Sequence, residues 1–269
     1  MPDEARDNFV TLRRPGEPLR GLVSRIGGYQ ENGRQLHGLI EAASLVVPLI
    51  ISFGDAYSIA LGRSPEKGDA YASFTAGLYP GHVVMDSTGG SACIQIDFTP
   101  LGAYRFFGLP MRELAAQMVH LDDLPDDEIA LLRRRLEDTE DWSRRLDLAE
   151  TFVTGRLRRG RAVSAGVTSA YRELAFCHGN VRIETIAARL DWSRKHLAQR
   201  FQEEIGVSPK QLARMLRFNR LLALAAHSST PDWADLAAEC GYADQAHMTR
   251  EFTDFAGTTP TRWKPHAAA

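Results

Sequence analysis

The chain has 269 residues, of which 44% are hydrophobic and 25% charged, a profile typical of soluble globular proteins of about two domains. The polar opening segment has no apolar core typical of a secretory signal, and no apolar run is long enough to predict a membrane span. The formal net charge of −2 gives no general attraction for nucleic acid. Three widely spaced cysteines form neither a disulfide framework nor a zinc motif, which favours a reducing cytoplasm.

The first part of the chain is expected to be rich in β-structure. Residues 1–18 are polar and contain proline, so we expect a flexible arm there. Short apolar or alternating runs then follow, separated by Gly, Pro, Asn and Asp, and they predict an antiparallel sandwich or barrel. These runs are Leu22–Ile26, Leu36–Ile40, Leu45–Phe53, Tyr57–Leu61, Tyr71–Leu78, His82–Asp86 and Ala92–Phe98.

Residues 101–161 predict a helical extension of this part, giving a β-rich sensor or dimerisation domain over 19–161. Prolines and acidic residues stand where helices should begin. The predicted helices are Leu101–Phe107, Met111–Val119, Pro125–Leu136 and a long amphipathic helix from Asp141 to the basic run 156–161. The apolar stripe near Asp141–Val153 would be costly if exposed in a monomer, so it predicts the contact of a homodimer.

The C-terminal part, residues 164–265, contains the same pattern twice. The copies are Ile186–Pro209 and Leu236–Pro260; they are offset by 237 − 187 = 50 residues before the turn and 252 − 201 = 51 after it. Each copy predicts a helix, a tight turn, a second helix and a glycine stop. Such a pair is a helix-turn-helix, whose second helix can enter the major groove of DNA.

Local residues support these turns. Ser193 and Asp244 stand at the N-caps of the two second helices, and Gly241 suits a turn that requires positive φ. The first copy has Asp191 at the position of Gly241, and Asp tolerates that region less well. A linking helix should run from Pro209 to a break at Ser228–Ser229. It would be about 28 Å long, close to the roughly 34 Å between successive turns of one groove.

The two second helices carry the candidate DNA-reading residues. Arg and Lys can donate to guanine, Gln can pair with adenine, and Ala can touch a thymine methyl group. The candidates are Ser193, Arg194, Lys195, Ala198 and Gln199 in the first helix, and Gln245, Ala246, Thr249 and Arg250 in the second. Arg200 and Arg217, with Arg214 and Arg220, could instead contact phosphates, which position a protein without specifying sequence. The alternative interpretation is that all of these residues belong to ordinary solvated helix faces.

The motifs of this region resemble the DNA-binding domain of AraC/XylS-type transcriptional regulators. They are S-x-x-H-L-x-x-x-F at 193–201, G-V-S-P-K at 206–210, R-F at 217–218, L-A-x-x-x-G-Y-x-D-Q-x-H-x-x-x-x-F at 236–252 and A-G-T-T-P at 256–260. Asp191-Trp192 departs from the usual Gly and aromatic residue. The β-rich part resembles the N-terminal domain of one branch of that family, through Pro100–Gly108 and Leu121–Leu124.

The resemblance implies an α+β protein: a β-rich, sandwich- or barrel-like domain with a helical extension, followed by an all-α double helix-turn-helix. It implies a cytoplasmic, sequence-specific DNA-binding regulator, an activator, with double-stranded DNA as a partner. A homodimer, a small-molecule effector and RNA polymerase are further expected partners, and no membrane, cofactor or metal is expected.

Two alternatives remain open from the sequence. The N-terminal domain could serve protein interaction alone, in which case its core should be filled; a cavity with a few polar groups would favour sensing. A DNA-acting enzyme would need a reactive cysteine with a base, and Cys93 lies in an apolar strand without one. His37, His82 and His120 lack metal-ligand spacing, so no catalytic residue or metal ligand is assigned.

Overall fold

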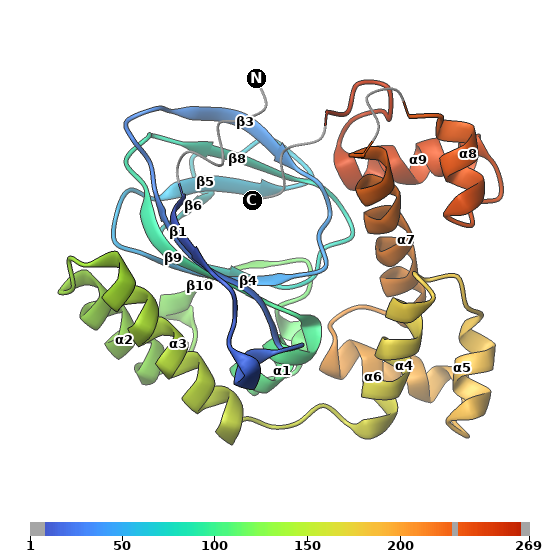
Figure 1. The fold of residues 1–269 in the computed structure, drawn as a ribbon, viewed down its shortest axis with the longest axis horizontal. Coiled ribbons are helices and arrows are strands. Elements are labelled where there is room, and N and C mark those ends of the chain that lie inside the picture. The colour runs from blue at the N-terminus through green and yellow to red at the C-terminus, as the bar shows by residue number, and fades with distance from the viewer. Residues whose placement is uncertain (1–8, 228–230, 265–269) are drawn as a thin grey trace.

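The structure, a computed structural model, describes residues 9–227 and 231–264, which divide into a β-rich part and an all-helical part. Figure 1 shows two facing sheets on one side and the helices of the second half of the chain on the other. The predicted α+β class, with a β-rich sandwich and an all-α double helix-turn-helix, is confirmed. No helix within those two ranges is long and apolar enough to cross a membrane.

Two antiparallel sheets form the β-rich part, in the strand orders β1-β2-β9-β4-β7-β10 and β3-β8-β5-β6. The larger sheet contains β1 (Phe9–Arg13), β2 (Val23–Gln30), β4 (Val47–Ser52), β7 (Phe74–Ala76), β9 (Ala92–Phe98) and β10 (Met118–His120). The smaller contains β3 (Leu36–Glu41), β5 (Tyr57–Leu61), β6 (Ala70–Tyr71) and β8 (Val83–Ser87). Each of the predicted strand runs overlaps at least one of these strands.

The central strand β9 faces two different environments. It pairs with β2 on one side and with β4 on the other. Ile94, Ile96 and Phe98 are fully buried beneath the helical layer. Because side chains alternate along a strand, Gln95 and Asp97 point the other way, into the space between the sheets.

The helical layer covers the outer face of the larger sheet (Figure 1). It consists of α1 (Pro100–Phe107), α2 (Asp127–Glu137) and α3 (Trp142–Arg159), with short 3-10 turns η1 (Glu17–Leu19), η2 (Met111–Glu113) and η3 (Leu121–Asp123). α3 begins at the predicted cap, since the Asp141 carboxylate accepts the Arg144 N–H at 2.8 Å. Leu146, Ala149 and Val153 of α3 are buried in the core of the same chain. The apolar stripe that predicted a dimer contact is therefore already covered, and the prediction that it is exposed is wrong.

Two other predictions about this part are wrong. The helix expected over Met111–Val119 ends after η2, because Ala116 adopts a φ of +52° and Met118–His120 pairs with β7 as β10. The open edge of β7 thus outweighs the helical spacing of the local sequence. Residues 9–13, expected within the flexible arm, form β1, whose Arg13 is ion-paired with Asp147 and Glu150 of α3. Residues 1–8 of that arm and the expected break at Ser228–Ser229 lie outside the described residues.

The second half of the chain is helical. Its helices are α4 (Ala165–Phe176), α5 (Ile183–Arg189), α6 (Arg194–Glu204), α7 (Pro209–Ala225), α8 (Trp233–Glu239) and α9 (Gln245–Ala256). α7 connects the α5–α6 pair at one end with the α8–α9 pair at the other (Figure 1). Its first turn is fixed by a capping box, in which Ser208 and Gln211 satisfy each other's backbone N–H groups.

The helical half contacts the β-rich half near the C-terminal ends of α6 and α9. Arg112 of η2 is ion-paired with Glu203 of α6. At the other end of α7, the Ala43 N–H donates to the Phe255 carbonyl at 2.8 Å, and the Asn219 Nδ2 donates to the Ala43 carbonyl at 3.1 Å. The first residues of α6 and α9, Arg194 and Gln245, are exposed.

Candidate nucleic-acid interface and N-terminal cavity

The two helix-turn-helix units repeat one turn geometry. In the first, the Trp192 N–H donates to the Ala187 carbonyl at 2.9 Å; in the second, the Tyr242 N–H donates to the Ala237 carbonyl at 2.9 Å. The residue just before the donor has a left-handed backbone conformation in both units, with a φ of +54° at Asp191 and +77° at Gly241. Asp191 therefore adopts the conformation that Gly241 has in the second unit, and the departure at 191–192 does not change the turn.

The caps that the sequence predicted are also formed. The Ser193 hydroxyl accepts the His196 N–H at 3.1 Å, and the Asp244 carboxylate accepts the His247 N–H at 2.6 Å. Each cap satisfies one of the free N–H groups at the start of α6 or α9. The single inserted residue, Ala243, is exposed and lies in the turn just before the second cap.

We call α6 and α9, the second helices of the two units, the recognition helices. One face of each is buried and the opposite face is accessible. Leu197 and Phe201 of α6, like Met248 and Phe252 of α9, are fully buried. The exposed candidates are Ser193, Arg194, Lys195, Gln199, Gln245, Ala246 and Arg250, and the half-buried ones are Ala198, Arg200 and Thr249. The structure therefore places the candidate base readers on two accessible faces at equivalent positions of the two units.

The paired histidines pack against the turns. His196 lies edge-on to the Trp192 ring, with centroids 4.6 Å apart, and His247 lies edge-on to Tyr242, at 5.4 Å. These contacts fix the start of each recognition helix against its own turn.

The candidate phosphate contacts are bound within the protein. Arg200 is ion-paired with Glu204, Arg214 with Glu251 at 2.7 Å, and Arg220 with Glu239 at 3.2 Å. The Arg217 side chain is only 17% exposed; it donates to the Gly179 carbonyl at 3.4 Å and lies 5.7 Å from the centre of the Tyr242 ring. Arg214, Arg217 and Arg220 thus hold the second unit onto α7, whereas the ion pair of Arg200 lies within α6.

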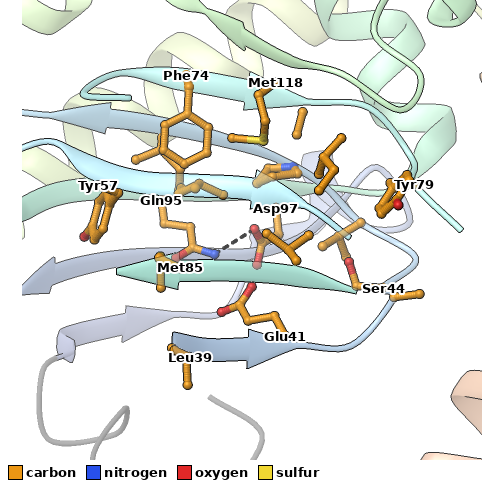
Figure 2. Close-up of a pocket in the computed structure, with 18 of the residues that line it drawn as sticks. Leu39, Glu41, Ser44, Tyr57, Phe74, Tyr79, Met85, Gln95, Asp97 and Met118 are labelled. Atoms are coloured by element: carbon orange, nitrogen blue, oxygen red, sulfur yellow. Dashed lines mark hydrogen bonds between the residues drawn. The ribbon is translucent and has the colours of Figure 1, made fainter. Parts of the chain in front are cut away.

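A cavity of about 300 Å³ lies between the two sheets. Its walls are mostly apolar and come from both sheets, as Figure 2 shows. The apolar and aromatic lining includes Leu39, Ile50, Tyr57, Ile59, Phe74, Met85 and Met118. The polar groups gather at one side, where Glu41 of β3 and Asp97 of β9 reach toward each other (Figure 2). Apolar walls with a few convergent polar groups are typical of small-molecule sites.

The two carboxylates in this cavity differ in their surroundings. Asp97 is ion-paired with Arg25 at 2.7 Å and accepts the Gln95 amide at 3.0 Å. Glu41 makes no hydrogen bond or ion pair with any residue in 9–227 or 231–264. Glu41 is exposed and lies at the border of the cavity, at the end of β3. Removal from bulk water, and secondarily the charge of Asp97, raises the pKa of Glu41, although Arg25 opposes this.

Cys93 also borders the cavity, as an unreactive thiol. It is 2% exposed, and burial raises its pKa to about 12. Its polar neighbour is the Tyr57 hydroxyl, at 4.0 Å. At neutral pH the group is therefore a protonated thiol, and the thiolate that a nucleophile requires is not formed.

Sequence reasoning missed the polar group of the cavity. Gln95 and Asp97 alternate with Ile94, Ile96 and Phe98, so their strand was recognised, but alternation predicts only that the polar face differs from the core face. Water or a cavity can lie on that face. The distinguishing signal was that Cys93, on the same face, is apolar enough to argue against a solvated surface.

Comparison with known proteins supports the assignment of the C-terminal region. Residues 186–265 match the family model described as a helix-turn-helix domain. No curated protein sequence matches the chain.

Among solved structures, the chain is similar to ToxT from Vibrio cholerae, with 11% identity, a TM-score of 0.46, and coverage of 88% of this chain and 96% of that one. The C-terminal domain of the response regulator AraT from Geobacillus stearothermophilus matches with 22% identity and a TM-score of 0.34, over 40% of this chain and 93% of that one. The AraC-like transcriptional activator CuxR matches with 17% identity and a TM-score of 0.29, over 78% and 79%.

The turn of the second unit can be tested at Gly241. Gly241→Ala should destabilise the protein by about 1–3 kcal/mol, because the residue is left-handed and a methyl group would collide with the Asn180 side chain. Thermal unfolding measures the loss. Ala243→Ser, at the exposed neighbouring position, should change stability by less than about 0.5 kcal/mol. Equal stability of Gly241→Ala and the wild type would contradict the turn geometry.

The raised pKa of Glu41 predicts that ionisation of this side chain lowers the stability of the ligand-free protein. The direction of the pKa shift means that ionised Glu41 is disfavoured in the folded protein, and because the side chain is exposed, water screens much of the effect; Glu41→Gln should therefore raise Tm by no more than about 1 °C at neutral pH. The folded protein holds this proton to higher pH than the unfolded chain does. The advantage of the variant should therefore shrink as pH falls through the raised pKa and vanish below the ordinary value, near 4.3.

Thermal unfolding of wild type and variant between about pH 4 and pH 8 measures this difference. Glu140→Gln, at an exposed position between α2 and α3, is the control and should show no such trend. A Tm difference that is the same at every pH would refute the prediction.

Proposed function

We propose that this chain, a DNA-binding transcriptional regulator with an AraC-type helix-turn-helix domain at its C-terminus, reads two adjacent stretches of one DNA site. The duplicated unit with its two accessible helix faces carries the proposal. Equivalent turns, equivalent caps and equivalent buried positions present α6 and α9 in the same manner. A single helical hairpin would be weak evidence for DNA reading, because such hairpins are common in cores that bind nothing, whereas two in register joined by one helix are much stronger evidence.

The base contacts are assigned to the accessible faces. In α6, Ser193, Arg194, Lys195, Ala198 and Gln199 supply them, and in α9, Gln245, Ala246, Thr249 and Arg250. Gln199 and Arg250 occupy equivalent positions, since 250 − 199 = 51, and both are exposed. A glutamine suits adenine and an arginine suits guanine, so the two units would read different sequences. The site therefore need not be a palindrome.

Phosphate contacts are assigned to Arg200 and Arg217. Both are tied to protein groups, so each would share its guanidinium between an internal partner and the DNA. A guanidinium has five N–H donors, which permits such sharing. This arrangement would fix the angle of each unit on the DNA backbone without adding sequence preference.

The cavity supports effector sensing over a role confined to protein interaction. A purely structural sandwich would fill its interior, whereas this one encloses about 300 Å³ with a charged group and apolar walls. Its rim also adjoins the second reading unit. Glu41 ends β3, and two residues later Ala43 is hydrogen-bonded to Phe255 and Asn219. An effector that shifts Glu41 would therefore act directly on the contact that holds α9.

Homodimerisation, a cytoplasmic location and activation through RNA polymerase complete the proposal. The dimer contact must lie outside the apolar stripe of α3, which is buried. Leu131 on the outer face of α2, 56% exposed, is the large apolar side chain that this helical layer offers to a partner.

The base readers can be tested by substitution. Gln199→Ala and Arg250→Ala should each cost roughly 1–3 kcal/mol in binding and relax preference at one cluster of base pairs. The two clusters should lie about 10 base pairs apart. Selection from a random DNA library with each full-length variant measures this. Unchanged base preferences at every position would rule out these two residues as readers.

Arg217→Ala provides the contrast for that experiment. Losing a phosphate contact should weaken binding to all sequences alike and lower the salt slope by about one. Since Arg217 also contacts Gly179 and Tyr242, unfolding must be followed in parallel. A change of base preference in Arg217→Ala, or an unchanged salt slope with a stable fold, would contradict the assignment.

The dimer can be tested in the full chain. Sedimentation at micromolar concentration should show a dimer, and Leu131→Glu should shift it toward monomer by placing a charge in the contact. Leu12→Glu, on the edge strand β1, is the matched control with a similarly exposed leucine and should remain dimeric. A strictly monomeric wild-type chain would exclude the dimer.

A further inference from the structure

The carboxylate of Glu41, which has no hydrogen-bond or ion-pair partner among the described residues, defines the chemistry of the cavity. We propose that the space between the two sheets binds a small apolar molecule carrying one cationic nitrogen, which Glu41 receives as an ion-pair partner. The proposal deepens the effector role proposed above and rests on it only for the regulatory consequence; binding itself requires no DNA.

The charge of the cavity favours a cation. Its charged lining residues are Arg25, Glu41 and Asp97. Arg25 and Asp97 form an ion pair at 2.7 Å, and the Gln95 amide takes up a further oxygen of Asp97. These two charges cancel, and the negative charge of Glu41 remains. A ligand cation placed beside Glu41 would give this carboxylate an ion-pair partner at the border of the cavity.

An anionic ligand fits this arrangement poorly. It would meet Glu41 and Asp97 on the same side of the cavity, where Figure 2 shows both carboxylates. The positive group available there, Arg25, is already engaged by Asp97. Repulsion between like charges in a space of low dielectric would oppose binding.

The other lining residues favour a ligand that is apolar apart from its cationic nitrogen. Leu39, Ile59, Met85 and Met118 from opposite sheets offer no hydrogen-bonding group, which disfavours a sugar. Aromatic rings also line the space: the centroids of Tyr29 and Tyr57 are 6.4 Å apart, and those of Tyr57 and Phe74 are 6.5 Å apart. Such rings pack against an apolar group and attract a cation through their faces. A volume of about 300 Å³ is at the small end for ligand sites, which suits a compact amine.

The experiment uses full-length protein and matched probes that differ only in charge. The first series is 3-phenylpropylamine, 3-phenylpropan-1-ol and 3-phenylpropanoate; the second is hexylamine, hexan-1-ol and hexanoate. Titration calorimetry at neutral pH should show an amine binding more tightly than the alcohol and carboxylate of its series. Glu41→Gln should weaken that amine about tenfold or more and bring it level with the alcohol.

Two further variants sharpen the result. Glu41→Asp keeps the charge and should retain a preference for the amine over the alcohol, and Glu140→Gln should leave all affinities unchanged. The proposal is overturned if a carboxylate binds as tightly as its amine, if Glu41→Gln leaves amine binding unchanged, or if neither amine binds at millimolar concentration. Because DNA is absent from the titration, failure here leaves the DNA-reading proposal standing, and the library selection tests that proposal separately.

Discussion

The division of β9 into two faces is the constraint on which the rest of the molecule depends. One face supplies Ile94, Ile96 and Phe98 to the core beneath α1 and α3, and that packing fixes the strand in place. The other face is thereby held rigidly toward the smaller sheet, with Gln95 and Asp97 presented to the cavity. A polar group at the end of a packed strand keeps its position without a ligand, which lowers the entropic cost of binding one.

A short backbone segment also connects the cavity to the helical half of the chain. β3 lies across the cavity from β9, and its last residue, Glu41, precedes Ala43 by two positions. Both backbone polar groups of Ala43 are used by the helical half, one by Phe255 of α9 and one by Asn219 of α7. A change in the backbone position of Ala43 would therefore alter its hydrogen bonds to α9 and α7. The first unit is held at a separate point, by the ion pair of Arg112 with Glu203.

Sequence reasoning recovered the features that depend on local chemistry. The caps at Ser193 and Asp244 and the helix start at Asp141 follow from side-chain donors and acceptors within one turn, so they were predictable. The segment 111–119 was not, because its strand β10 exists only through the edge that β7 offers. The cavity carboxylates were missed for the same reason: Glu41 and Asp97 lie on different strands of different sheets, and only the tertiary fold brings them together.

The internal pairing of the arginines explains how a chain of low net charge can carry a DNA-binding domain. From Ser164 onward there are 13 Lys and Arg against 11 Asp and Glu, a surplus of 13 − 11 = +2. Arg214 and Arg220 are neutralised by Glu251 and Glu239, which lock α7 to the second unit. Exposed cations without an ion-pair partner among the described residues lie on α6 and α9, as Lys195 and Arg250 do, and also on other helices, as Arg172 and Lys210 do. The surplus of two positive charges gives this region little general attraction for phosphate, so in the proposed complex discrimination between sequences would come from base contacts.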